Sequence, residues 1–195
     1  MENCQWQKLG DLIDLKTSKQ TLVKKQYVEN GQYNVITSAS KPAGKYDQFN
    51  EAGKQITISK DGTCGVILWH EQPFYLADGA FVIKIKPGVD LDIRYLYHYL
   101  KRSQAEINEM QIGQPIAHLY KADLNQLKVY VPDLETQKQI AATLDQFNQL
   151  TNQLTNQLTN QLNLRTKQYQ YYLEHLMDFT NANHPLIKDG GGGGN

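Results

Sequence analysis

The sequence predicts an α+β fold: a domain with a twisted multi-strand sheet and helices, followed by one long α-helix. Residues 33–131 contain short runs of β-branched and aromatic residues separated by Gly, Pro and Asp, which is typical of strands joined by turns. Residues 133–179 contain neither glycine nor proline, and their apolar residues recur at three- and four-residue steps. That period is the period of a helix. We therefore predict a domain over 1–132 and a helix over 133–180.

The strands are predicted from alternation and from turn residues. Residues 6–15 carry a short-helix or turn signal, and residues 38–49 read as a loop because they include serines, Pro42 and Gly44. Asp61-Gly62 is a turn signal, since this dipeptide suits backbone with positive φ. Strands are expected at 33–37, 55–59, 64–69, 74–76, 80–85 and 127–131.

A helix is predicted at 93–111, between the last two strands. Asp92 precedes it and can cap its first turn. Leu96, Tyr99, Leu100 and Ile107 recur within it at helical spacings. A Gly-Gln-Pro segment after residue 112 ends it.

The long helix is predicted to need a partner. Residues 148–162 read Asn-Gln-Leu followed by three Thr-Asn-Gln-Leu units, so that Leu150, Leu154, Leu158 and Leu162 share one broad face. Thr and Asn are poor helix formers, so this repeat is marginal alone. A helix of roughly 45 residues is about 68 Å long, which exceeds the diameter of a small domain. An antiparallel coiled coil with a partner is expected.

The composition indicates a globular chain. Its formal net charge is zero and 40% of its residues are hydrophobic. Cys4 and Cys64 form no disulfide framework or metal motif, and there is no signal peptide or run of about 18 apolar residues. These features predict a cytoplasmic protein with no membrane contact. Residues 181–195 contain Pro185 and five consecutive glycines and are predicted to be disordered.

The charge distribution is compatible with DNA binding in the first segment only. Residues 1–60 contain nine Lys or Arg and six Asp or Glu, a net charge of nine minus six, or +3. Neutral overall charge argues mildly against a nucleic-acid binder, whose domains are often basic. DNA binding therefore requires the lysine patches to share one face and a partner to supply further positive charge.

The sequence contains no catalytic constellation. A phosphate-binding Gly-rich loop followed by Lys-Ser/Thr is absent, as are HExxH and the Asp/Asn-Pro-Pro-Tyr motif of amino-methylating enzymes. The five histidines are scattered, with no carboxylate at the spacing of a dyad. We therefore predict a non-catalytic protein that binds no metal or cofactor itself.

Two segments are candidates for nucleic-acid contacts. Residues 59–65 place a lysine, hydroxyls and two glycines in a tight turn, which can bring backbone amides and a cation to a phosphate. Residues 111–120 form a glycine-flanked loop whose glutamine can pair with adenine. The alternative for the first is an ordinary hairpin turn. The alternative for the second is a helix C-cap followed by a loop.

Five segments together resemble the specificity subunits of type I restriction–modification systems. The resemblance covers residues 5–180, which is half of the usual subunit: one target recognition domain and one conserved spacer helix. The most specific match is Val131 to Ala141, which resembles the "v-P-p-L-e-e-Q-x-x-I-a" opening of the spacer helix. The other matching segments are 6–12 (W-x-x-x-L-G-D-I), 58–65 (i-s-r-x-G-x-x-G), 95–100 (Y-L-Y-Y-x-L) and 113–119 (G-s-x-i-x-x-l).

The resemblance implies a prokaryotic DNA-reading subunit. The domain is expected to read one half of a bipartite target in double-stranded DNA, and a homodimer is expected to read a palindrome with a gap. Methyltransferase subunits with S-adenosylmethionine and motor-nuclease subunits with ATP and Mg are the implied partners. The alternative is a non-DNA adaptor or lectin-like domain on a coiled coil.

These expectations assign roles to individual residues. The expected DNA-binding residues are Lys19, Lys24, Lys25, Ser38, Lys41, Ser59, Lys60, Thr63, Gln114 and His118. The expected dimerisation residues are Ile140, Leu144, Phe147, Leu150, Leu154, Leu158, Leu162, Tyr169 and Leu173.

The glycine-rich end suggests two origins. Every glycine codon begins with GG, so the gene can hold a long G tract that is prone to slippage. A frameshift at this tract would split a longer gene. A linker left from expression is the alternative.

Overall fold

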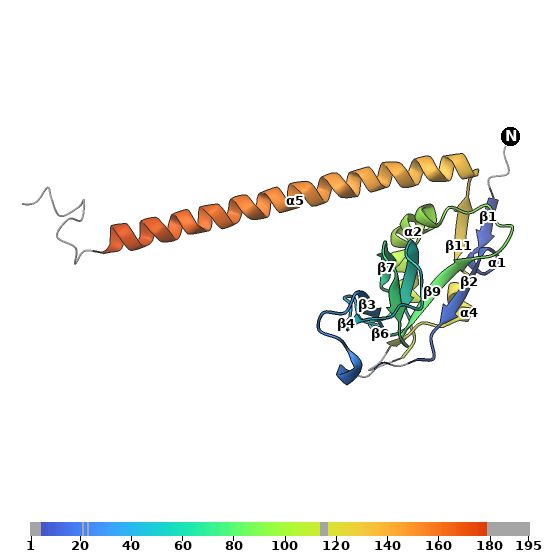
Figure 1. Cartoon of the computed structure of the whole chain (residues 1–195). Helices are drawn as coiled ribbons and strands as arrows, with labels where there is room; N and C mark the ends of the chain where they lie inside the picture. Colours follow the sequence, from blue (N-terminus) through green and yellow to red (C-terminus); the bar gives the residue numbers. More distant parts are fainter. Residues whose placement is uncertain (1–4, 21, 23, 114–116, 179–195) are drawn as a thin grey trace, which may run out of the picture. The chain divides into compact units, whose positions relative to one another are not determined.

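A four-stranded antiparallel sheet forms the centre of the fold (Figure 1). The structure is a computed structural model and describes residues 5–20, 22, 24–113 and 117–178. Ile13 lies opposite Ile85, and Ile58 lies opposite both Ile67 and Phe81, so the buried strands present apolar side chains to one core. The strand order is β2 (Ile13–Thr17), β9 (Ala80–Ile85), β5 (Gln55–Ser59) and β7 (Ile67–His70).

Three smaller sheets surround this centre. The first joins β4 (Gly44–Tyr46), β3 (Tyr33–Ile36) and β8 (Phe74–Leu76), with β3 antiparallel to β4 and parallel to β8. The second pairs β1 (Gln5–Lys8) with β11 (Lys128–Val131), and the third pairs β6 (Asp61–Gly62) with β10 (Ala117–His118). Short helices complete the domain: α1 (Leu9–Leu12), η1 (Lys24–Gln26) and α4 (Lys121–Leu124).

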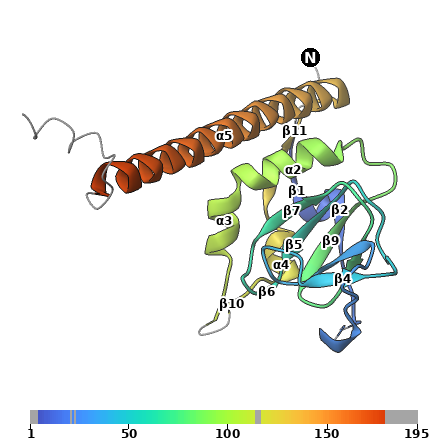
Figure 2. The same cartoon turned by 60° about the vertical axis from the view of Figure 1, so that its left-hand side comes forward.

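The helix predicted at 93–111 is two helices. α2 (Ile93–Arg102) packs against β5 and β7, and α3 (Gln104–Glu109) follows it after a break at Ser103 (Figure 2). Leu96 and Leu100 of α2 have no exposed surface. The predicted cap is confirmed, because the Asp92 carboxylate accepts a hydrogen bond from the Tyr95 N–H at 2.8 Å.

Three other local predictions differ from the structure. Residues 6–15 contain two strand segments around α1 in place of a lone helix or turn, and residues 38–49 contain β4 within the predicted loop. The returning strand begins at Ile67, not at residue 64. Gly65 has a φ of +73° and its N–H bonds to the Ser59 carbonyl at 2.9 Å, so the backbone is still turning there.

The last helix, α5, runs from Leu134 to Met177 without interruption, as the long helix of the prediction does. Asp133 caps it, since its carboxylate accepts from the Thr136 N–H at 2.9 Å and lies 2.5 Å from the Thr136 hydroxyl. Those hydrogen bonds lower the pKa of the Asp133 carboxyl. Among the described helices, none is long and apolar enough to cross a membrane.

The first turns of α5 belong to the globular unit. The chain divides into a unit of residues 1–144 and a second unit that begins at Asp145, whereas the sequence placed the boundary after residue 132. The difference arises because Gln137 and Ala141 are buried. The Gln137 amide accepts from the Asp92 N–H at 2.7 Å and donates to the Asp90 and Pro132 carbonyls at 3.1 and 2.7 Å.

The threonines of the repeat bond to their own helix. The hydroxyl of Thr155 donates to the carbonyl of Thr151 at 2.8 Å, and Thr159 donates to Thr155 at the same distance. Thr151 donates likewise to Phe147 at 2.9 Å. Each threonine hydroxyl is thereby satisfied four residues back along the chain.

Candidate nucleic-acid interface

The two segments singled out from the sequence lie side by side. Gly62 pairs with Ala117 and Asp61 pairs with His118 in the short sheet of β6 and β10 (Figure 2). The Leu119 N–H also donates to the Lys60 carbonyl at 2.8 Å. The first segment is thus the turn of the β5–β7 hairpin, and the second segment is its neighbour. We call this region the turn cluster: residues 59–65, Asp78, Gly79, Ser38, Ala117 and His118.

Lys60 is held between two carboxylates in the turn cluster. Its ammonium nitrogen lies 2.8 Å from Asp78 Oδ1 and 3.3 Å from Asp61 Oδ2, and its side chain is only 22% exposed. The hydrogen bond to Asp78 raises the pKa of Lys60 and lowers the pKa of Asp78. A phosphate that approaches Lys60 must therefore compete with two neighbouring negative charges.

His118 links the two segments through its side chain as well as its backbone. Its Nδ1 lies 2.8 Å from Asp61 Oδ1, and both side chains are partly exposed. This contact orients the imidazole and does not use its other ring nitrogen. That nitrogen can donate to or accept from a base edge or a phosphate, according to its tautomer.

Ser38 and Gly79 bring a third chain segment into the turn cluster. The Lys60 N–H donates to the Gly79 carbonyl at 2.8 Å. Gly79 has a φ of +109°, and a Cβ at this position would lie 2.8 Å from the Ser38 backbone nitrogen. Only glycine allows the two backbone segments to come this close. The half-buried Ser38 also lies beside Gly62.

Buried side chains fix the shape of the turn. The Ser59 hydroxyl is buried, donates to the Thr63 carbonyl and accepts from the Val66 N–H at 2.9 Å. The Cys64 thiol lies 2.7 Å from the Ala117 carbonyl, and burial raises its pKa. Gln104 donates to the Gly65 carbonyl at 2.7 Å from α3. The structure therefore gives Ser59 a role in shaping the turn, while Thr63 is exposed on it.

Four of the lysines expected to contact DNA are exposed. Lys19 immediately precedes Gln20, whose carbonyl accepts from the Asp78 N–H at 3.1 Å. Lys41 follows Ser38 by three residues, and Lys24 and Lys25 lie on the exposed η1. These four lysines are exposed, whereas the charge of Lys60 is partly neutralised by Asp61 and Asp78. Gln114, the remaining expected DNA contact, lies outside the described residues.

The expected dimerisation residues are all exposed in the single chain. Leu150, Leu154, Leu158 and Leu162 are 55–67% exposed, and Phe147 is 63% exposed. The others have between 38% and 64% of their surface exposed: Ile140, Leu144, Tyr169 and Leu173. Apolar side chains at this exposure on one helix face indicate a surface that another molecule covers.

Several supporting residues were missed by sequence reasoning. Asp61 and Asp78 neutralise Lys60, and Gln104 and Gln111 hold the turn from the α3 side, with Gln111 donating to the Cys64 carbonyl at 3.2 Å. The Asp-Gly pairs at 61–62 and 78–79 each indicate a turn, but no local signal shows that the two turns meet. The glutamines carry no such signal, since their partners are backbone groups distant in sequence.

Taken together, these features define a class: a mixed α+β domain that presents loops at one end of its sheets and continues into a long helix with an exposed apolar face. The comparison with family models specifies that class further. Residues 1–164 match the type I restriction modification DNA specificity domain, and the chain belongs to this family.

Curated relatives agree with this family. The chain is 26% identical over 150 residues to a putative type I specificity subunit of Mycoplasma genitalium, which covers 75% of the chain and 39% of the relative. It is 28% identical over 186 residues to a putative type I restriction enzyme specificity subunit of Haemophilus influenzae, covering 88% and 47%. The chain thus spans less than half the length of these relatives.

Solved structures agree on the fold. The S subunit of a type I restriction–modification system from M. genitalium superposes with a TM-score of 0.72 at 24% identity, covering 90% of this chain and 47% of the other. A chain from a structure described as showing complex assembly and conformational transition of the type I R-M system gives 0.68 at 18% identity, covering 87% and 44%. The predicted α+β domain with a long spacer helix is confirmed.

Proposed function

We propose that this chain reads one half of a bipartite DNA target for a type I restriction–modification complex. The observation that carries the proposal is the pairing of residues 61–62 with 117–118, which brings the two segments with candidate DNA contacts together. Membership of the specificity family supports it. His118 and Thr63 are partly or fully exposed there and can reach base edges.

Exposed lysines supply the sequence-independent part of binding. Lys19, Lys24, Lys25 and Lys41 are exposed, and Lys19 precedes Gln20, whose carbonyl accepts from the Asp78 N–H. Such lysines contact phosphates and position a protein on the duplex, while neighbouring loops read the bases. Lys60 is a weaker phosphate ligand than these four because two carboxylates share its charge.

The chain acts as a non-catalytic homodimer in this proposal. Two copies joined through the exposed leucine face present two identical domains, so the target is palindromic with a non-specific gap. Methyltransferase subunits carry S-adenosylmethionine and methylate adenine, and motor-nuclease subunits use ATP and Mg. Within the described residues, no group of three or more His, Cys, Asp or Glu side chains is placed to hold a metal ion.

DNA binding is tested by titrating the purified chain with its methyltransferase partner against duplex DNA at several salt concentrations. Affinity that falls steeply with salt supports the proposal, because phosphate neutralisation releases counterions. Binding that is absent, or that ignores salt, supports the adaptor or lectin-like alternative. Sequencing of methylated sites in cells that carry the complex then identifies the target, and an asymmetric target contradicts the homodimer.

The repeat is proposed to set the gap. One added Thr-Asn-Gln-Leu unit extends α5 by about 6 Å and rotates the distal part of the helix by roughly 40°. One base pair extends DNA by about 3.4 Å and rotates it by about 35°. Insertion of a unit after Leu162 should widen the gap by one or two base pairs and keep the half-site bases. Unchanged spacing with retained methylation would show that the repeat is only a tether.

A further inference from the structure

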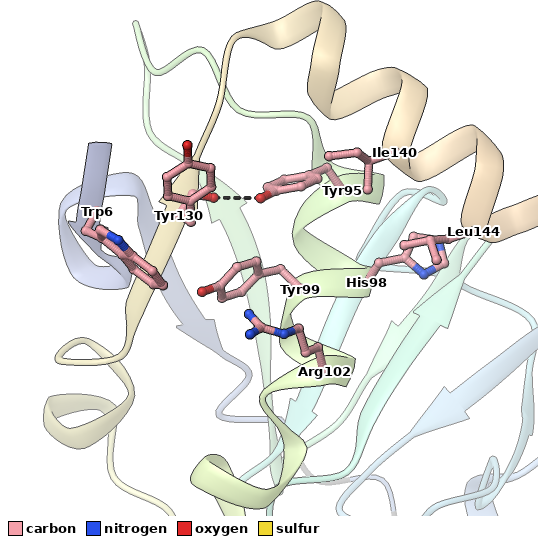
Figure 3. A pocket seen from close by; sticks show the side chains of 8 residues that line it. All are labelled: Trp6, Tyr95, His98, Tyr99, Arg102, Tyr130, Ile140 and Leu144. Carbon is pink, nitrogen blue, oxygen red and sulfur yellow. Dashed lines mark hydrogen bonds between the residues drawn. The ribbon is translucent and has the colours of Figure 1, made fainter. Parts of the chain in front are cut away.

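The globular unit has an aromatic pocket at the start of α5. Its volume is about 620 Å³, and side chains from β1, α2, β11 and α5 line it (Figure 3). Trp6 and Tyr130 form one wall with their rings 5.5 Å apart in an edge-to-face arrangement, and Tyr99 projects from α2 toward Trp6. Ile140 and Leu144 close it from the helix. We call it the aromatic pocket.

The aromatic pocket suits an apolar or aromatic occupant. Trp6 is 60% exposed, although a tryptophan of this size normally gains free energy from burial. The Tyr95 hydroxyl donates to the Tyr130 carbonyl at 2.6 Å, so this polar group is already satisfied (Figure 3). Arg102 lies over the Tyr99 ring at 5.7 Å, which leaves a guanidinium at the rim. Tyrosine, with an apolar ring and a polar tip, fits such a surface.

Two residues that line the aromatic pocket belong to the same helical stripe of α5 as the repeat leucines. At 100° per residue, Ile140, Leu144 and Phe147 lie on the same side of the helix as Leu154 and Leu158. Ile140 and Leu144 also line the pocket. A second helix that packs along this stripe as far as Ile140 therefore also reaches the pocket.

The sequence of α5 gives the register of that second helix. The four repeat leucines are placed symmetrically about Asn156, and the midpoint of the helix Leu134–Met177 lies between Thr155 and Asn156. A two-fold axis at Asn156 thus aligns two antiparallel helices over their whole length. It also sets Leu150 opposite the partner's Leu162 and Leu154 opposite the partner's Leu158.

The same axis brings the tyrosine-rich end of the partner to the aromatic pocket. Ile140 then lies opposite the partner's Tyr172, and Leu144 lies opposite the partner's Gln168. Tyr169, Tyr172 and Leu176 share the leucine face of α5 and are 64%, 51% and 44% exposed. A slip by one repeat moves the residue opposite Ile140 only to 168 or 176, which bound the same segment.

We propose that residues 168–177 of a second copy of this chain occupy the aromatic pocket in the dimer. The inference rests on the homodimer of the proposed function and adds a contact to it: the end of one spacer helix packs on the recognition domain of the other copy. Each domain thereby contacts two helices: its own α5 and the C-terminal part of the partner's α5.

Engineered cysteines test this contact in the full chain. A variant with Ile140→Cys, Tyr172→Cys and Cys4→Ser should form interchain disulfides under mild oxidation and run as a covalent dimer. Within one chain the two positions are separated by about 48 Å of helix, so they cannot bridge intramolecularly. The matched control is Lys138→Cys with Glu174→Cys. These positions are also symmetric about Asn156 but lie five turns from it, on the face opposite the leucines, and should not cross-link.

Protection of Trp6 gives a second measurement. In a Trp69→Phe variant, Trp6 is the remaining tryptophan, and its quenching by acrylamide should fall several-fold on dimerisation. Trp6→Ala should raise the dimer Kd about tenfold. A dimer by light scattering with neither cross-linking nor protection overturns the pocket contact and retains the homodimer. A monomer overturns both. Cross-linking of Ile140→Cys alone indicates parallel helices, and protection that appears only with methyltransferase assigns the pocket to that subunit; both outcomes overturn the proposal.

Discussion

The globular unit and the helix beyond Asp145 satisfy their side chains in opposite ways. In the globular unit, Leu9, Ile56, Leu96 and Val129 have no exposed surface and belong to one core. In the helix, the repeat leucines are more than half exposed. The first region can fold through its own contacts. In the proposed homodimer the second gains most of its stability from its partner, because helix propensity alone contributes little in this sequence.

Gln137 lies in the first turns of α5, close to the boundary between the two units. Its amide is buried and bonds to three backbone groups, two near the start of α2 and one at Pro132. The first turns of α5 are therefore part of the domain, and the direction in which the helix begins is set inside the globular unit. The domain thus determines how the helix starts, whereas in the proposed homodimer the partner stabilises the rest of the helix.

The largest expected effect is on the exposed leucine face. Leu154→Ala removes two leucines from a symmetric dimer, which costs about 4 kcal/mol of association and raises the dimer Kd about a thousandfold. Analytical ultracentrifugation measures this, and the thermal unfolding of the globular unit should not change. Asn156→Ala, two residues away on the opposite face, is the control. Equal Kd values for the two variants would show that the leucines are not at the interface.

A somewhat smaller effect is expected at the junction. Gln137→Leu leaves the Asp92 N–H and the carbonyls of Asp90 and Pro132 without their partner, and should lower the free energy of unfolding by about 3 kcal/mol. Urea denaturation of the full chain measures the loss. The exposed Gln139→Leu serves as the control and should stay within about 0.5 kcal/mol. If the two variants are equally stable, the buried amide does not anchor the helix.

The globular unit should also be acid-sensitive through His70. Burial lowers the pKa of His70 to about 4, and its Nε2 lies 2.8 Å from the Thr57 hydroxyl. A depressed folded-state pKa contributes stability that is present above the unfolded value of about 6.5 and is lost as the pH falls toward 4. Unfolding free energies should therefore fall by about 2 kcal/mol more in the parent than in His70→Gln over this interval.

The matched control for acid sensitivity is His175→Gln on the exposed helix. It should follow the parent at every pH, since His175 lies outside the globular unit. A parallel decline of the parent and His70→Gln would show that His70 does not cause the acid sensitivity.

The smallest effect is expected in the turn cluster. Lys60→Ala should weaken binding to all DNA sequences several-fold and reduce the salt slope by about one. Asp78→Asn should act in the opposite direction, because it removes the carboxylate that bonds to Lys60 at 2.8 Å. Lys128→Ala, exposed on β11, is the control. If Lys60→Ala changes neither affinity nor salt slope, Lys60 does not contact DNA and only stabilises the turn.

The sequence predicted most of what local chemistry determines. The alternating strand 55–59, the Asp92 cap and the uninterrupted helix from Leu134 each arise from short-range patterns, and the structure contains them. The strands at 5–8 and 13–17 were missed because their pairing partners, β11 and β9, are far away in sequence. The break at Ser103 was missed because apolar spacing continues across it to Ile107.

The candidate site was predicted as two separate segments. Their meeting depends on the pairing of β6 with β10, which brings together residues more than fifty positions apart. The prediction for Lys60 lacked its carboxylate partner for the same reason, since Asp78 lies on another turn. Exposure of the leucine face was predictable from the length of the helix, because a helix of about 68 Å extends beyond the diameter of a small domain.

The threonine hydrogen bonds of α5 also affect how this chain can change over generations. Each Thr-Asn-Gln-Leu unit occupies four codons and satisfies its hydroxyl on the unit before it. Duplication or loss of a unit therefore keeps the reading frame and leaves the same set of bonds in every remaining unit. Recombination between the repeats in the gene can thus produce helices of new length in single events, and each product retains an intact backbone and an unchanged recognition domain.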